Sequence, residues 1–142
     1  MGLLDKLFGT QPKYPPLPAG SAAIGKLDEI KAPLEELAHK VHDHLQVVPA
    51  EHEAFVFLGK PPESFGVAWI HDGKVASLKD IAKEYHLSDV QVGELVFRLG
   101  EAYQHASESP RYSAEFGGKQ MVVIPSSGLE REMHQIMSNT LH

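Results

Sequence analysis

The sequence contains no cysteine, a single tryptophan and few basic residues. The lack of cysteine excludes disulfides, thiol catalysis and cysteine-ligated metal sites, and it fits a reducing compartment such as the cytoplasm. No apolar run approaches the roughly 20 residues that cross a bilayer, so we expect no membrane span. With 13 Lys and Arg against 19 Asp and Glu, the net charge is −6, which disfavours DNA and other phosphate-rich partners.

The chain of 142 residues has the length of one domain, preceded by a short segment of different composition. Residues 1–21 combine an apolar start (Leu3, Leu4, Leu7 and Phe8) with a proline-rich stretch, and we expect this segment to be flexible. The apolar start is either a plain terminal turn or a weak anchor for a membrane surface or a partner. Residues 22–142 are predicted to form a single folded domain.

Local patterns predict both helices and strands in this domain, which indicates an α+β fold. An apolar stripe at helical spacing follows Pro33, and alternating apolar residues and turn signals follow Pro49. The expected elements are a helix at 33–46, strands at 54–59, 65–71 and 74–76, a turn at Asp72-Gly73, a hairpin around Gly117-Gly118, and a last helix that begins at a capping box formed by Ser127 and Glu130.

The stretch LKDIAKEYHLSDVQVGEL, residues 78–95, predicts two helices joined by a tight turn. Ser77 with Asp80, and Ser88 with Gln91, form two capping-box patterns eleven residues apart. Each predicted helix has one apolar face, carried by Leu78, Ile81, Ala82 and Tyr85 in the first and by Val92, Leu95, Val96 and Leu99 in the second.

This stretch resembles the helix-turn-helix of regulators of the lac repressor type. The resemblance rests on Leu78, Asp80, Ile81, Ala82, Leu87, Ser88, Val92 and Leu95, which are packing or capping positions of that family's pattern. The family favours glycine in the turn because the backbone there is left-handed, whereas this chain has His86, a residue that tolerates that conformation better than most. The resemblance implies two helices packed at a small residue, here Ala82.

The order of the predicted elements extends this resemblance to a winged helix. A helix, a short strand, two helices and a hairpin follow one another, so that the turn at Phe116-Gly117-Gly118-Lys119 would be the tip of the wing. We therefore expect a winged-helix-like domain with an extra β-hairpin and a C-terminal helix.

The second helix of the pair has an acidic outward surface. Its outward residues are predicted to be Asp89, Val90, Gly93, Glu94 and Phe97. A DNA-reading protein typically makes about 6–10 phosphate contacts, largely through Lys and Arg, and this helix offers only Arg98 against three acids. Exposed apolar residues are usually buried on something, so we expect Asp89, Val90, Glu94 and Phe97 to bind a protein partner or a second copy in a homodimer. The alternative is that Phe97 packs under the hairpin of its own chain.

The residues also allow two other functions, DNA binding and metal binding. A DNA-binding regulator would use the basic residues Lys79, Lys83, Arg98, Arg111 and Lys119. A metal-binding protein would use Glu35, His39 and His42, which share one flank of the predicted 33–46 helix.

Catalytic patterns are weak throughout the sequence. Neither a nucleophile turn nor a phosphate-binding glycine loop is present, so we predict no catalytic residues and no cofactor. An active site assembled from distant loops would leave no local pattern, so the enzyme class stays open. The sequence favours binding without catalysis.

Overall fold

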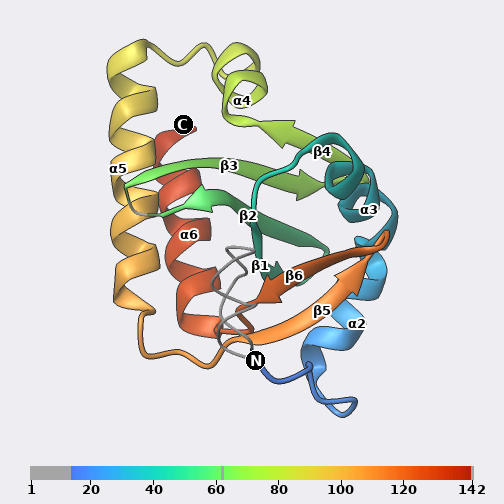
Figure 1. The fold of residues 1–142 in the computed structure, drawn as a ribbon. Coiled ribbons are helices and arrows are strands. Elements are labelled where there is room, and N and C mark those ends of the chain that lie inside the picture. The colour runs from blue at the N-terminus through green and yellow to red at the C-terminus, as the bar shows by residue number, and fades with distance from the viewer. Residues whose placement is uncertain (1–13, 62, 142) are drawn as a thin grey trace, which may run out of the picture.

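The computed structural model describes residues 14–61 and 63–141 as an α+β fold built on one mixed sheet (Figure 1). Its elements follow in the order α2 (Ala22–Glu29), α3 (Lys31–Lys40), β1 (Leu45–Ala50), β2 (Glu53–Lys60), β3 (Ser64–His71), β4 (Lys74–Ser77), α4 (Leu78–Glu84), α5 (Asp89–His105), β5 (Tyr112–Phe116), β6 (Lys119–Val123) and α6 (Ser127–Thr140). The strand order across the six-stranded sheet is β4-β3-β2-β1-β6-β5. Only β1 and β6 pair in parallel among these neighbours.

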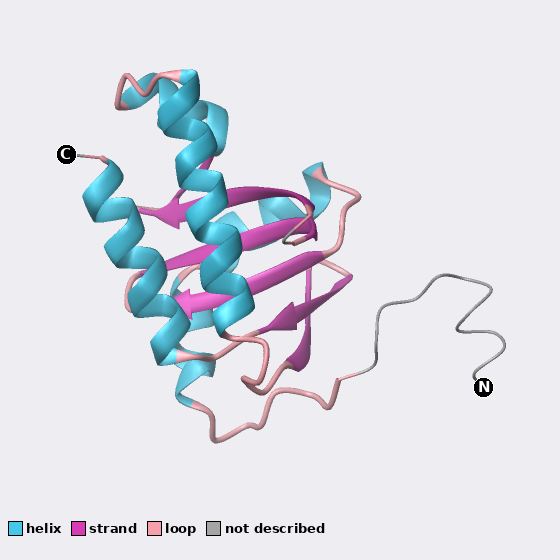
Figure 2. Cartoon of the chain, turned by 90° about the vertical axis from the view of Figure 1, so that its left-hand side faces the viewer, coloured by secondary structure: helices cyan, strands magenta, loops and turns pink. Residues whose placement is uncertain are grey.

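Helices cover both faces of the sheet. Figure 2 shows α5 and α6 side by side over one face, while α2 and α3 lie over the other. Strand β2 explains this arrangement, because Phe55 and Phe57 point into the core beneath α5 and α6, and Ala54 and Val56 point into the core beneath α2 and α3. A strand buried on both faces has a continuous apolar sequence, as AFVF does here.

The hairpin predictions are confirmed by the strand pairing. β2 pairs with β3 and β5 pairs with β6, both antiparallel. Asp72 and Gly73 both have positive φ, at 52° and 73°, in the turn between β3 and β4, as a two-residue Asp-Gly turn requires. The last helix is confirmed, but its cap is one residue earlier than predicted, because the Ser126 hydroxyl accepts the hydrogen bond from the Leu129 N–H.

The prediction of one helix across 33–46 is wrong for its second half. Helix α3 ends at Lys40, and Leu45 begins a central strand. The β-branched pair Val47-Val48 favours a strand, and this preference prevails over the helical spacing of Leu45. Proline has no N–H to donate, yet Pro49 is tolerated in β1. The Val47 carbonyl accepts from the Ile124 N–H, so the backbone of residue 49, two positions further on, also faces the β6 side of the strand. β6 ends at Val123, so the missing N–H of Pro49 costs no hydrogen bond to that strand.

The described part of the proline-rich stretch is hydrogen-bonded to the edge of the sheet. Leu17 N–H donates to the Ser113 carbonyl and Ser113 N–H donates to the Pro15 carbonyl, so residues 15–17 extend the sheet beside β5. Tyr14 packs against the core beneath α5 and α6, and Leu17 packs against the core beneath α2 and α3. The apolar start at Leu3, Leu4, Leu7 and Phe8 lies outside the described residues.

The winged-helix arrangement is not confirmed. The strand that precedes the two helices, β4, is at one edge of the sheet, whereas the hairpin β5–β6 is at the other. The hairpin therefore pairs with β1 rather than with the strand beside α4. The order of elements is as predicted, but three strands, β3, β2 and β1, lie between β4 and the expected wing.

Candidate functional site: the outer flank of α5

Helices α4 and α5 are positioned by the two predicted capping boxes. The Ser77 hydroxyl accepts from the Asp80 N–H while the Asp80 carboxylate accepts from the Ser77 N–H, and Ser88 and Gln91 repeat this exchange. The hydrogen bond from the Ser77 backbone, followed by that with its hydroxyl, lowers the pKa of Asp80. The box at α4 therefore keeps its charged, accepting form at neutral pH.

The turn between the helices has the left-handed residue that the sequence predicts. His86 is left-handed, with φ of 56°, and the Leu87 N–H donates to the Ala82 carbonyl at 2.9 Å. Leu87 and Tyr85 pack against the core beneath α5 and α6, so the turn is held on the body of the protein. The local geometry of the helix pair is thus fixed by residues that the sequence already singled out.

The buried side of α5 determines which of its residues face outward. Leu95, Leu99 and Ala102 are buried against the sheet, with exposed fractions of 1%, 0% and 0%. The five residues predicted to point outward are all exposed. We call these residues the outer flank of α5: Asp89, Val90, Gly93, Glu94 and Phe97.

Two apolar side chains stand out on this flank. Val90 is 79% exposed and Phe97 is 66% exposed, and these are the exposed large hydrophobic side chains among the residues that the structure describes. Phe97 therefore does not pack under the hairpin of its own chain. Met133 and Met137 of α6, with exposed fractions of 0% and 3%, belong to the core and cannot enlarge this apolar surface.

A groove of about 320 Å³ runs beside Phe97, between α5 and the start of β3. We call it the α5–β3 groove, and its lining residues are Glu63, Phe65, Gly93, Val96, Phe97, Gly100, Glu101 and Gln104. Its lining combines apolar side chains and two glycines with two carboxylates. This groove was not predictable from local patterns, because Glu63 and Phe65 come from a different hairpin and only the fold brings them beside α5.

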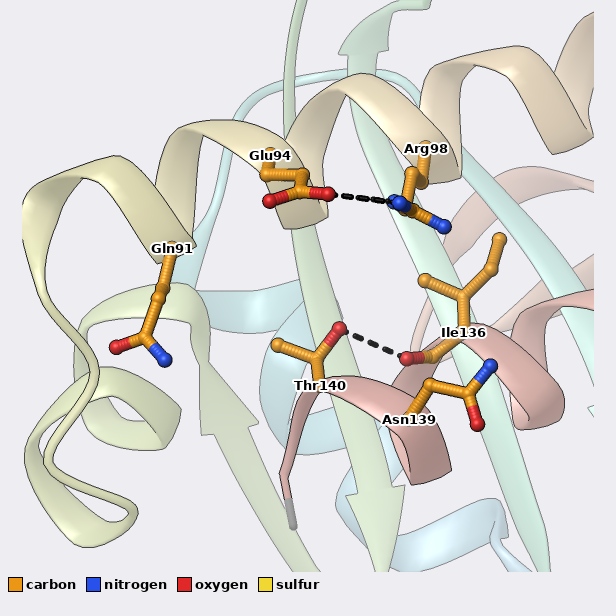
Figure 3. Close-up of a pocket in the computed structure, with 6 residues that line it drawn as sticks. All are labelled: Gln91, Glu94, Arg98, Ile136, Asn139 and Thr140. Atoms are coloured by element: carbon orange, nitrogen blue, oxygen red, sulfur yellow. Dashed lines mark hydrogen bonds and ion pairs between the residues drawn. The ribbon is translucent and has the colours of Figure 1, made fainter.

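On the side toward α6, a second and more polar hollow of about 380 Å³ lies between α5 and α6 (Figure 3). Its polar groups largely satisfy one another. Arg98 Nη2 donates to Glu94 Oε1 at 2.7 Å, and the Thr140 hydroxyl donates to the Ile136 carbonyl at 2.8 Å, as the dashed lines show. Asn139 accepts from Gln135 at 3.1 Å. Each of these three contacts lies within one helix, α5 or α6, so they pair the polar side chains of the hollow without linking the two helices.

The basic residues proposed for DNA contact do not form one surface. Lys119 Nζ donates to the carbonyls of Val41 and Asp43 at 2.9 and 2.7 Å, which ties the hairpin to the loop after α3. Arg111 donates to the carbonyls of Ala106 and Ser109, and its guanidinium lies 5.3 Å from the centre of the Tyr103 ring.

The remaining three basic candidates are close to carboxylates. Arg98 is held by Glu94, and Lys79 and Lys83 flank Asp80 on α4. Lys79 and Lys83 follow β4, at the opposite edge of the sheet from the hairpin that carries Lys119. The five positive charges are therefore dispersed, and several are committed to contacts within the chain.

The proposed metal ligands are separated by the early end of α3. Glu35 and His39 lie on α3, but His42 follows its last residue, Lys40, and does not continue the same helical flank. Glu35 and His39 instead hold the β5–β6 turn, with the Gly117 N–H donating to Glu35 and the Gly117 carbonyl 3.2 Å from His39 Nε2. Within residues 14–61 and 63–141, no group of three His, Asp or Glu side chains is placed to hold a metal ion.

Comparisons with protein-family models, curated proteins and solved structures find no match to this chain. In the described part of the chain, no helix is both long enough and apolar enough to cross a membrane. Among the described residues, the outer flank of α5 carries the large apolar side chains that the fold leaves exposed, Val90 and Phe97.

Proposed function

We propose that this is a non-catalytic, cytoplasmic binding protein that docks a protein partner, or itself, through the outer flank of α5. The observation that carries the proposal is the exposure of Val90 and Phe97 on a helix whose inner side is closely packed. Monomeric proteins keep contiguous apolar surface small, and an apolar patch with a polar rim is typical of an interaction site. Asp89 and Glu94 supply that rim.

The α4–α5 helix pair supports a helix-turn-helix unit that serves protein binding. The capping boxes and the left-handed turn at His86 favour a helix-turn-helix unit derived from, or convergent with, that of winged-helix regulators. In this chain the outward face of its second helix carries carboxylates in place of a basic reading surface. We therefore propose that the unit serves protein binding.

The size of the apolar surface sets the expected affinity. Full burial of a valine or phenylalanine side chain contributes about 1.5–3 kcal/mol, and association itself costs at least about 4 kcal/mol. Val90 and Phe97 alone barely offset that cost, so the α5–β3 groove must take part. We expect affinities in the micromolar range.

The double variant Val90→Ser/Phe97→Ser tests this function. We expect immobilised wild-type protein to retain a specific protein from cell extract, which includes further copies of this chain, and the double variant to lose it, because both apolar contacts are removed. The matched control is Val75→Ser/Tyr112→Ser, which changes partly buried residues of the two edge strands. Mass spectrometry identifies the retained proteins, and thermal melting confirms that each variant is folded. Equal retention by the wild type and the double variant would contradict the proposal.

DNA binding is the second candidate, favoured by the geometry of the α4–α5 turn alone. We expect no shift of duplex DNA at physiological salt, because acids outnumber bases on α5 and affinity for DNA depends on Lys and Arg displacing counterions. Fluorescence anisotropy of labelled duplexes over a range of salt concentrations measures this. A salt-sensitive micromolar complex, weakened by both Lys119→Ala and Arg98→Ala, would favour the regulator instead.

A further inference from the structure

We infer that residues 14–17 form a strap that closes the β5 edge of the sheet against strand addition and that opens while the domain stays folded. The strap consists of Tyr14, Pro15, Pro16 and Leu17. The edge of a sheet presents unpaired N–H and C=O groups, to which any extended segment can add as a further strand. The inference concerns this edge alone and does not depend on the function proposed for α5.

The strap uses the backbone groups of Ser113 that face away from the sheet. The Ser113 N–H donates to the Pro15 carbonyl at 2.8 Å, and the Leu17 N–H donates to the Ser113 carbonyl at 3.0 Å. The Ser113 hydroxyl adds a third hydrogen bond, to the Tyr14 carbonyl at 3.1 Å. The strap therefore lies parallel to β5, on the side opposite β6, and takes the place that another strand would take.

Proline at position 16 ends the sheet at the strap. Because the backbone groups of Pro15 and Leu17 bond to β5, the backbone of Pro16 between them faces away from the sheet. Proline has no N–H, so the strap offers no donor at the position where a further strand would need one. The strap thus covers one edge without creating another, which is the use that edge prolines have in sheets.

The opposite edge of the sheet has its own protection. Strand β4 has only four residues, and it begins with the exposed Lys74. The N–H of its last residue, Ser77, is already bonded to the Asp80 carboxylate in the capping box of α4. Short edge strands, and lysine on them, both disfavour strand addition. Strand β5, with the sequence YSAEF, has no lysine, so its edge depends on the strap.

The strap has few contacts with the rest of the protein. Tyr14 and Leu17 are half-buried, each against the core on a different face of the sheet, while Pro15 and Pro16 are exposed. The residues that connect the strap to α2, 18–20, are exposed as well. Segments with few buried contacts open locally at a lower free energy than the core. The strap can therefore leave β5 without a change in the packing of either core.

Hydrogen exchange at the Ser113 amide tests whether the strap closes the edge. Leu17→Asp places a charge at a half-buried apolar position, so the strap should open and the Ser113 amide proton should exchange at least about tenfold faster in NMR spectra. Leu17→Pro removes the Leu17 N–H without adding a charge and should act in the same direction. The matched control, Ala19→Asp, adds the same charge at an exposed residue and should leave the exchange unchanged. Thermal melting confirms that each variant is folded.

Sedimentation velocity tests whether the opened edge accepts a strand, since the other copies in a pure sample supply extended edges. All variants carry Val90→Ser/Phe97→Ser, so that α5 does not contribute. We expect Leu17→Asp to associate at a concentration at least about tenfold lower than Ala19→Asp. Glu115 lies two residues after Ser113, so its N–H also faces away from β6. Adding Glu115→Pro removes this donor and should return Leu17→Asp to the monomer.

Three results would overturn the inference. If the Ser113 amide exchanges as slowly in Leu17→Asp and Leu17→Pro as in the Ala19→Asp control, the strap is not what closes the edge. If exchange is faster but Leu17→Asp stays as monomeric as the control, the strap does not prevent strand addition. If Leu17→Asp associates and Glu115→Pro does not reverse this, the new contact lies away from β5.

Discussion

Replacing Leu99 by alanine should lower the free energy of unfolding by about 2–5 kcal/mol, whereas Phe97→Ala should change it by no more than about 0.5 kcal/mol. The two positions are two residues apart on α5, yet Leu99 is fully buried and Phe97 is 66% exposed. Truncation at 99 leaves a cavity among the side chains of the sheet and α6, while truncation at 97 removes a side chain that is mostly in water.

Urea denaturation followed by circular dichroism measures both changes. The samples must be dilute enough that any dimer dissociates, because association adds to the apparent stability of the wild type. A loss at Phe97→Ala comparable with that at Leu99→Ala would show that Phe97 belongs to the protein's own core, and the docking surface would then have no apolar centre.

The second large effect is expected at the middle of the sheet. Phe57→Ala should cost about 3–5 kcal/mol, because Phe57 is fully buried on strand β2 and its loss opens a large cavity. Its ring packs edge-on against Tyr103 of α5, with the ring centres 5.1 Å apart, and at a tilt against Phe65 of β3, with the ring centres 5.7 Å apart. The same residue therefore supports the C-terminal half of α5 and one wall of the α5–β3 groove.

The matched control for this prediction is Phe65→Ala. Phe65 is only partly buried, so its loss should destabilise the protein by less than half as much. Thermal melting gives the ranking directly, since each kcal/mol corresponds to roughly 2–4 °C in a domain near this size. Equal losses at the two positions would mean that the central strand is less closely packed than its burial indicates.

Features set by nearby residues could be predicted from the sequence. The two capping boxes, the left-handed turn at His86 and the Asp72-Gly73 turn each depend on contacts between residues a few positions apart, and all were found as expected. The outward side of α5 was also predictable, because a packed helix repeats every 3.6 residues and the apolar stripe through Leu95 and Leu99 fixes which side faces the core.

Features that depend on distant residues were not predictable. β1 is paired in parallel with β6, a strand more than seventy residues later, and this pairing moves the expected wing away from α4. The role of Lys119 depends on carbonyl groups of Val41 and Asp43, which its neighbours in sequence do not reveal. The same is true of Glu35 and His39, whose partner is the backbone of Gly117.

The docking role of the α5 flank is tested most directly by amide NMR spectra of the wild-type protein recorded from micromolar to millimolar concentration. Self-association through this flank predicts that the signals of residues from Asp89 to Gln104 and of Phe65 shift together as the concentration rises, while those of α2 and α3 stay fixed. The Val90→Ser/Phe97→Ser spectra should not change with concentration. Signals of α5 that stay constant while those of β4 or another edge shift would contradict the role assigned to α5.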